Sequence, residues 1–237
     1  MREHIHTIPV IEALREPGLC AFCAMMRKLD ENAIRFIMGP AYMEDDVRMK
    51  TNKTGFCKKH MEAMYKEQNR LGLALMLHTH VQELNKNVKS MVEYVKKPTI
   101  FGSSSDSYID KLGEHLVATY EDCYICQSIR DTFDRYVDTF FSLWIKGGSE
   151  GQLVQTQKGY CLHHFTVILK YAGKLGAKKR KKFMSEILPV WQEHVKELEA
   201  DLEWFTQKFD YKNKEEPWKN SKDALPRAIA ILGGDDT

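Results

Sequence analysis

Apolar residues recur at helical spacing along much of the chain. In three stretches they follow steps of three and four residues, which places them on one face of an α-helix. No run of strict apolar and polar alternation, the pattern of a half-buried strand, accompanies them. The sequence therefore predicts an all-α protein with long amphipathic helices. The apolar positions are Leu77, Val81, Leu84, Val88, Met91 and Val95; Ile129, Phe133, Tyr136, Phe140 and Trp144; and Ile187, Trp191, Val195, Leu198, Leu202, Phe205 and Phe209.

The chain contains an internal repeat marked by cysteine motifs. The C-x-x-C motif at 20–23 returns 103 positions later at 123–126, and the C-x-x-H motif at 57–60 returns 104 positions later at 161–164. The similarity extends to "HVQEL" at 80 and "HVKEL" at 194, which are 114 positions apart. A repeat of this length predicts two homologous helical halves, with about ten extra residues in the second.

The repeat also predicts the division of the chain. We expect a first zinc-binding half at 1–97, a linker at 98–107, a second zinc-binding half at 108–212 and a tail at 213–237. The linker, "PTIFGSSSDS", combines a proline, a glycine and a serine run, which are typical of flexible connections. In each half we expect the cysteine pair to be followed by a helix, an irregular crossing of about a dozen residues, the C-x-x-H motif and further helices.

The tail contains a short amphipathic segment with Leu225, Ile229 and Leu232 on one side. This pattern predicts a helix that docks onto the rest of the protein, although a helix that binds a partner is an alternative.

The cysteines predict metal binding. All six belong to the four motifs, so each half offers three thiols and one imidazole. Zn²⁺ prefers closed four-coordinate sites made of such ligands, so we expect two zinc ions per chain, one Cys3His site in each half. Ligands that cross between the halves remain an alternative. Each motif precedes a helical pattern, which predicts thiolates at helix N-termini. The predicted ligands are Cys20, Cys23, Cys57 and His60, and Cys123, Cys126, Cys161 and His164.

Other cysteine chemistry fits the motifs less well. Iron–sulfur clusters usually take four cysteines, covalent haem needs a histidine directly after the second cysteine, and thioredoxin-like catalysis needs a βαβ setting. Buried apolar cysteines would not explain a complete set that occurs twice. In "CLHH" His163 is an alternative ligand, but only His164 matches His60 in the repeat.

Three further groups of residues are candidates for a functional or packing role. Glu44, Asp45 and Asp46 could form a catalytic or second metal site, although acidic residues also favour the first turn of a helix. The basic run Lys178–Lys182 could bind nucleic acid, but lacks interleaved aromatic residues and more readily forms a solvated helical segment. His80 and His194, which the repeat aligns, are expected to pack near the core.

Composition and charge narrow the classes of protein. Hydrophobic residues make up 43% and charged residues 29%, and the formal net charge is +2, so the whole chain has no strong field for nucleic acid. The N-terminal residues lack the apolar region of a secretory signal, and no apolar run is long enough to span a membrane. We therefore expect a cytoplasmic location.

These features predict a zinc-binding helical protein that acts as a scaffold or interaction protein, with a possible protein partner. The motifs of nucleotide-binding loops and nucleophile elbows are missing, which disfavours an enzyme. The alternatives are a metalloenzyme or a thiol- and zinc-based redox sensor and, as a second alternative, nucleic-acid binding through the basic run.

The motifs "TIPV", "CAFC", "YMEDDVR", "GFCKKH", "NRLGLALMLHTH", "CYIC", "GYCLHH" and "DALPRAI" occur in this order. With them the chain resembles an uncharacterised bacterial family of similar length, catalogued as a domain of unknown function. Members are sometimes labelled as ABC transporter substrate-binding proteins, which the missing export signal contradicts. The resemblance implies zinc ligands at the same eight positions and brings no established activity.

Overall fold

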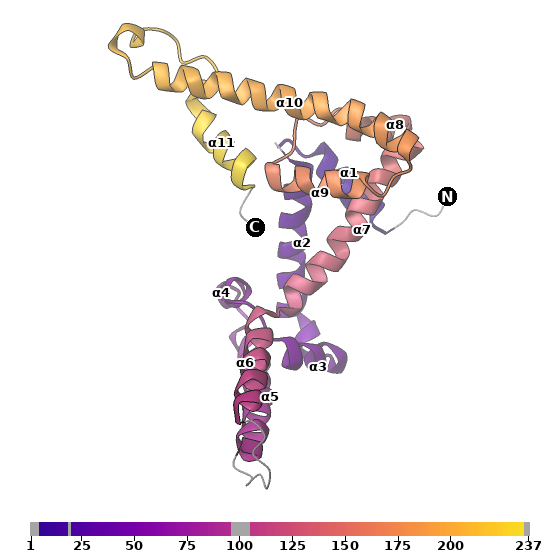
Figure 1. The fold of residues 1–237 in the computed structure, drawn as a ribbon, viewed down its shortest axis with the longest axis vertical. Coiled ribbons are helices and arrows are strands. Elements are labelled where there is room, and N and C mark those ends of the chain that lie inside the picture. Colours follow the sequence, from indigo (N-terminus) through magenta and orange to yellow (C-terminus); the bar gives the residue numbers. More distant parts are fainter. Residues whose placement is uncertain (1–4, 19, 96–104, 235–237) are drawn as a thin grey trace. The chain divides into compact units, whose positions relative to one another are not determined.

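The computed structural model describes residues 5–18, 20–95 and 105–234. In these ranges the chain forms eleven α-helices and three short 3-10 helices, without a strand (Figure 1). The prediction of an all-α fold is confirmed. The α-helices are α1 (Thr7–Arg15), α2 (Ala21–Met38), α3 (Asp45–Thr54), α4 (Lys58–Lys66), α5 (Arg70–Val95), α6 (Ser105–Glu121), α7 (Tyr124–Lys146), α8 (Gly148–Gln155), α9 (Leu162–Ala172), α10 (Ala177–Gln207) and α11 (Ala224–Gly233).

The helices form two compact units. The first unit comprises 1–28 and 132–237, the second comprises 29–131, and the boundaries fall inside α2 and α7. Each unit therefore combines segments from both sequence halves, and the predicted duplication stays a prediction. Of the predicted linker, 98–104 lie outside the described residues, and 105–107 belong to α6.

The order of helices after each cysteine motif recurs. A long helix, a short helix, the helix of the C-x-x-H motif and another long helix follow one another as α2 to α5 and again as α7 to α10. The expectation of an irregular crossing is wrong, because α3 and α8 occupy it. Both are short helices that bury an apolar residue, Val47 in α3 and Val154 in α8. Each adjoins a glycine with positive φ, Gly55 after α3 and Gly147 before α8.

Aromatic side chains form the core of the first unit. Phe22 and Phe140, both fully buried, contact each other edge to face with ring centroids 4.9 Å apart. Tyr160 lies 6.0 Å from Phe22, and Phe183 of α10 lies 6.4 Å from Phe140. Because such rings bury large apolar areas, this cluster fixes the N-terminal part of α2 against α7 and the segment that leads into α9.

The C-terminal helix α11 packs against α10 and α9. Its buried residues Ala228 and Ile231 contact Leu198 of α10. The three residues expected on the packing side instead point to solvent. The small side chains of Ala224 and Ala228 allow α11 to approach its neighbours closely. An ion pair of 2.7 Å between Arg227 and Asp201 of α10 holds α11 in this orientation about its own axis. The exposed fractions are 48% for Leu225, 71% for Ile229 and 65% for Leu232.

In the second unit, α5 contacts α3, α4 and α6, and α5 and α6 run side by side (Figure 1). The core of this unit includes Met64 of α4, Met76 of α5 and Ile125 of α7, all fully buried. Methionine is flexible and fills irregular gaps between packed helices.

A glycine and a histidine meet in both units. A Cβ at Gly55 would lie 2.4 Å from the ring of His80, and a Cβ at Gly159 would lie 2.7 Å from the ring of His194. Each glycine stands two positions before the cysteine of a C-x-x-H motif. The close contact fixes the start of the motif against the long helix that follows it, and it gives the two aligned histidines the packing role expected from the sequence.

Candidate metal centres

The eight predicted ligands gather into two clusters. In each cluster one ligand atom from every residue lies within 4.8 Å of the others. The spacing predicted one complete set in each sequence half, whereas each cluster joins the C-x-x-C motif of one half to the C-x-x-H motif of the other. The α2/α9 cluster consists of Cys20, Cys23, Cys161 and His164, and the α4/α7 cluster consists of Cys57, His60, Cys123 and Cys126.

All four motifs lie at helix N-termini, as predicted. Cys57 and Cys161 are the N-cap residues of α4 and α9, and Cys20 and Cys123 directly precede α2 and α7. The second ligand of each motif follows three residues later, in the first turn of the helix, where it returns to the same side. The partial positive charge of a helix N-terminus favours thiolates there.

The α2/α9 cluster is closed to solvent. The Sγ atoms of Cys23 and Cys161 are 3.6 Å apart, and Nδ1 of His164 lies 3.7, 3.3 and 3.2 Å from the Sγ atoms of Cys20, Cys23 and Cys161. No residue of this cluster has more than 6% of its surface exposed. The backbone N–H of His164 also points at Sγ of Cys161, at 3.4 Å.

Aromatic rings surround the histidine of this cluster. The Phe22 ring stacks on the His164 ring with centroids 5.8 Å apart, and Phe133 lies at 5.5 Å. The environment of the α2/α9 cluster is therefore apolar, which excludes water and competing ligands.

The α4/α7 cluster has the same donor set and a more open surface. Nδ1 of His60 lies 3.2, 3.3 and 3.4 Å from the Sγ atoms of Cys57, Cys123 and Cys126, and the sulfur atoms of Cys57 and Cys126 are 3.9 Å apart. Cys123 and His60 are buried, whereas Cys57 and Cys126 are partly exposed. The backbone N–H of Tyr124 donates to the carbonyl of Gly55 at 3.1 Å, which ties the two motifs together.

Asp30 of α2 is a neighbour of the second cluster that the sequence interpretation missed. Its Oδ1 lies 2.8 Å from Nε2 of His60. A carboxylate on the outer nitrogen of a ligating histidine fixes the ring and its tautomer, so that Nδ1 faces the thiols. In the repeat, Asp30 aligns with Phe133, which packs on His164. This difference between aligned residues was the one sign in the sequence that Asp30 has a particular role. Only the fold shows which histidine each of the two residues contacts.

The proton distribution of the metal-free clusters follows from the same contacts. Burial alone would lower the pKa of His60, but hydrogen bonds with Cys123 and Asp30 outweigh it and raise this pKa to about 9. Burial alone would raise the pKa of Cys123, whereas the hydrogen bond from His60 and backbone N–H groups lower it to about 6. Hydrogen bonds with Cys20 and Cys23 lower the pKa of Cys161 in the other cluster. These contacts favour the thiolate form of Cys123 in one cluster and of Cys161 in the other.

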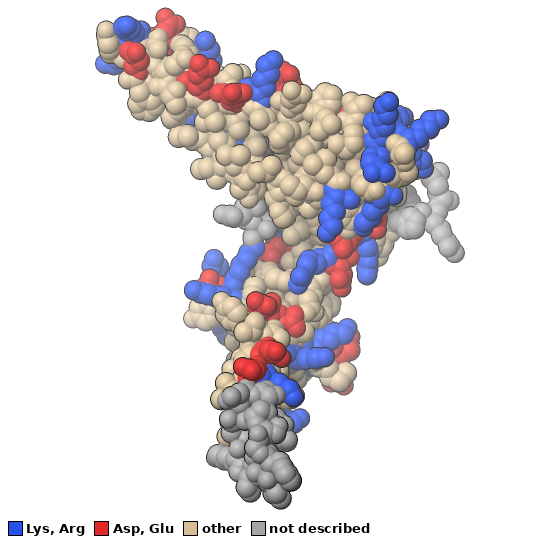
Figure 2. Space-filling view, viewed as in Figure 1, with Lys and Arg blue, Asp and Glu red and all other residues tan. Residues whose placement is uncertain are grey.

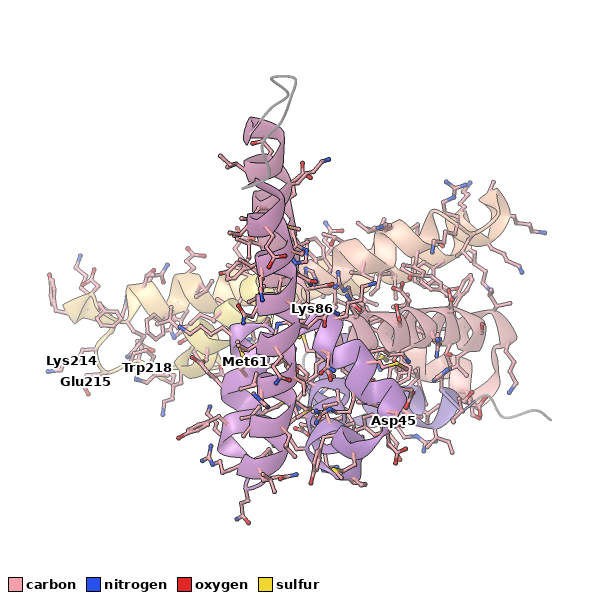
Figure 3. The ribbon with its side chains drawn as sticks, turned by 90° about the horizontal axis from the view of Figure 1, so that it is seen from below. Asp45, Met61, Lys86, Lys214, Glu215 and Trp218 are labelled. Carbon is pink, nitrogen blue, oxygen red and sulfur yellow. The ribbon has the colours of Figure 1, made fainter. Side chains whose placement is uncertain are left out.

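The acidic residues Glu44, Asp45 and Asp46 do not form a site. All three are exposed around the start of α3, where Figure 3 labels Asp45, and Asp46 pairs with Lys50 in the same helix at 3.9 Å. Among the described residues, groups of three or more potential metal ligands occur only in the two cysteine clusters. The acidic residues therefore act as favourable charges in the first turn of a helix.

The basic run Lys178–Lys182 forms an exposed patch on the first turns of α10. Figure 2 shows lysine and arginine side chains gathered at this end of the helix. Lys182 pairs with Glu186 at 3.9 Å and lies 5.8 Å from the ring centroid of Trp144. These are surface contacts of a solvated helix.

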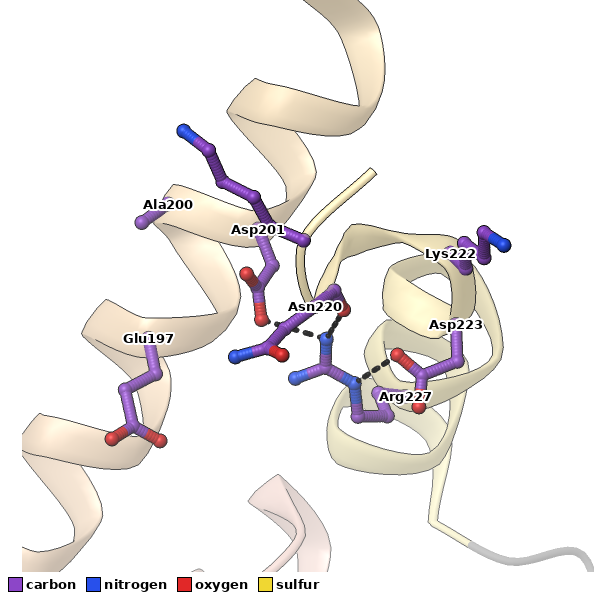
Figure 4. Close-up of a pocket in the computed structure, with 8 residues that line it drawn as sticks. Glu197, Ala200, Asp201, Asn220, Lys222, Asp223 and Arg227 are labelled. Carbon is purple, nitrogen blue, oxygen red and sulfur yellow. Dashed lines mark hydrogen bonds and ion pairs between the residues drawn. The ribbon is translucent and has the colours of Figure 1, made fainter. Parts of the chain in front are cut away.

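A hollow between α10 and α11 is lined by charged side chains (Figure 4). Arg227 at its wall donates to Asp201 at 2.7 Å, to Asp223 at 2.9 Å and to the carbonyl of Asn220 at 2.6 Å. Because three acceptors already neutralise and orient the guanidinium, it fixes α11 on α10 rather than presenting a free charge to a ligand.

The geometry defines a class, an all-α protein with two groups of three cysteines and one histidine that could bind metal ions. None of the six cysteines forms a disulfide. The chain belongs to the family of unknown function DUF6062, whose match covers residues 1–237. No curated protein and no solved structure matches the chain. Within the part of the chain that the structure describes, the helices are too short or too polar to cross a membrane.

Proposed function

We propose that the protein binds two zinc ions, one in each cluster, and that zinc is part of its folded structure. The distances between the donor atoms carry this proposal. Zn–S bonds of about 2.3 Å in a tetrahedral site place two sulfur atoms about 3.8 Å apart. The sulfur pairs at 3.6 and 3.9 Å match this edge, and the histidine nitrogens lie at 3.2 to 3.7 Å from the sulfurs. Three thiolates and one imidazole favour zinc over cations that prefer oxygen ligands, such as Mg²⁺ and Ca²⁺.

Zinc in this position stabilises the fold. Each cluster joins two helix N-termini that are 138 or 66 residues apart in the sequence, as measured between Cys23 and Cys161 and between His60 and Cys126. The unfolded chain holds no such site, so the free energy of zinc binding, on the order of 10 kcal/mol for a structural site, contributes to folding.

The role that fits this chemistry is that of a cytoplasmic scaffold or interaction protein. A catalytic zinc has three protein ligands and an open position, whereas four protein ligands complete a structural site. Cysteines that bind a metal ion and form no disulfides suit a reducing compartment.

Elemental analysis of the purified protein tests the proposal directly. We expect two equivalents of zinc per chain, little iron, and a melting temperature that falls when a strong chelator removes the metal. A protein that contains no zinc and melts at the same temperature with and without chelator would refute it. The interaction role is tested separately, by recovering a stable partner with the zinc-loaded protein; metal-dependent turnover of a small molecule would contradict it.

A further inference from the structure

The two clusters share one donor set but differ in access. Every ligand of the α2/α9 cluster is buried, and its histidine lies among phenylalanines. In the α4/α7 cluster the residues Cys57 and Cys126 are partly exposed, and a carboxylate holds the histidine. An oxidant in solution can therefore reach the α4/α7 cluster in the folded protein, whereas it can reach the α2/α9 cluster only if the core opens.

The accessible thiols are also neighbours. The sulfur atoms of Cys57 and Cys126 are 3.9 Å apart, and they come from the N-termini of two different helices, α4 and α7. Cys123, the third thiol, is 1% exposed and accepts the backbone N–H of Cys126 at 3.5 Å. Because Cys123 is buried, an oxidant in solution reaches it less readily than it reaches Cys57 or Cys126.

We propose that Cys57 and Cys126 are a site of reversible oxidation, at which a hydroperoxide converts the two thiolates to a disulfide and releases the metal ion from the α4/α7 cluster alone. This inference rests on the proposed zinc binding. It assigns different roles to the two clusters: the α2/α9 cluster is a permanent part of the core, and the α4/α7 cluster responds to oxidant.

The chemistry has two steps. One thiolate attacks a peroxide oxygen, the O–O bond breaks, and the products are a sulfenic acid and hydroxide. The second thiolate then attacks the sulfenic sulfur, the S–S bond forms, and a second hydroxide leaves. The two sulfurs together lose two electrons, which reduce one peroxide to two hydroxide ions. Two of four ligands are thereby lost, and a dithiol reductant reverses the change.

Lysines adjoin one of the two thiols. Lys58 and Lys59 directly follow Cys57, and the side chain of Lys58 is 86% exposed. Lys58 pairs with Glu62 of the same helix at 3.8 Å, and the positive charge at this surface attracts anionic thiols such as a glutathione-like reductant.

Hydrogen peroxide and the zinc-loaded wild-type protein provide the test. Zinc release is followed with a chromogenic chelator, the helical content by circular dichroism, and the oxidised cysteines by peptide mapping after alkylation of the remaining thiols. We expect one zinc equivalent to leave at least about tenfold faster than the other. We also expect a cross-linked peptide pair that contains Cys57 and Cys126, and recovery of two zinc ions after addition of dithiothreitol and zinc.

A variant that cannot form the disulfide supplies the control. In Cys57→Ser the Cys57–Cys126 disulfide cannot form, so peroxide should release no zinc ion at the fast rate. Equal release rates for both ions, retention of both, or a first disulfide at Cys20, Cys23 or Cys161 would overturn the inference. Absence of zinc from the untreated protein would instead refute the proposed function, and is measured before peroxide is added.

Discussion

The sulfur atoms of Cys23 and Cys161 are 3.6 Å apart, although 138 residues separate them in the sequence. Cys23 belongs to the first C-x-x-C motif and Cys161 to the second C-x-x-H motif, so the cluster crosses between the two sequence halves. This pairing of motifs from different halves links segments that are far apart in the sequence. A metal ion bound here closes a stretch of the chain that contains all four residues of the α4/α7 cluster, and each cluster takes two ligands from each half of the sequence.

Pairs of substitutions test this crossing. Cys20→Ser with Cys161→Ser damages one cluster twice, so we expect one zinc equivalent to remain. Cys20→Ser with Cys57→Ser damages both clusters, so we expect none to remain. Elemental analysis of the purified, soluble variants measures the zinc content of both. Ligand sets confined to each half would give the opposite result, and His163→Ala, which alters an exposed neighbour of the ligand His164, should retain two equivalents.

The sequence predicts the metal ligands but not how the four motifs pair into clusters. The C-x-x-C and C-x-x-H spacings identify the ligands because the geometry within a motif is local. They do not encode which motifs meet, because each pairing supplies the same three thiols and one imidazole. Asp30 was missed for the same reason, since its contact with His60 is made only in the folded chain.

The helical periodicity predicted the class of fold and most long helices, and it failed where a short helix offers two possible faces. In α11 the apolar pattern favoured the side of Ile229, but the packing of Ala228 and the ion pair of Arg227 bury the side of Ile231. Packing of small residues at close range can decide which face of a helix is buried, even when larger apolar side chains lie on the other face. The apolar periodicity of the sequence does not reveal this.

The buried and exposed faces of α11 provide a matched pair of variants. Ile231→Ala should lower the free energy of unfolding by about 2–5 kcal/mol, because it opens a cavity against Leu198. Ile229→Ala, on the 71% exposed position, should change it by less than about 0.5 kcal/mol. Urea unfolding of zinc-loaded protein measures both. A larger loss for Ile229→Ala would show that the opposite face of α11 is buried.

Phe22 links the core to the α2/α9 cluster. Its ring is fully buried against Phe140 and His164, so Phe22→Ala should cost about 3–5 kcal/mol and weaken zinc retention in this cluster. Phe36, in the same helix, is 55% exposed, and Phe36→Ala should be nearly neutral. Unfolding curves and zinc release rates distinguish the two. Equal effects of the variants would contradict the described core.

The glycine that precedes the second C-x-x-H motif is expected to be intolerant of a methyl group. A Cβ at Gly159 would meet the ring of the buried His194 at 2.7 Å, so Gly159→Ala should destabilise the protein by about 1–3 kcal/mol. Gly176→Ala is the control, because a Cβ there meets nothing within 4 Å. Thermal melts compare them, and a neutral Gly159→Ala would show that His194 is not packed on this backbone.

The contact between Asp30 and His60 predicts a selective effect on one metal site. In Asp30→Ala the outer nitrogen of His60 loses its carboxylate partner at 2.8 Å, so the ring is less firmly held with Nδ1 toward the thiols. Loss of such a partner typically costs about 10–100-fold in metal affinity. Competition with a chelator of known affinity should therefore show one weakened zinc and one unchanged zinc. Asp46→Ala removes a carboxylate with 69% exposure in the same unit and should leave both affinities unchanged. If Asp30→Ala weakens both ions equally, the effect is a general loss of stability; if it weakens neither, the carboxylate does not position His60.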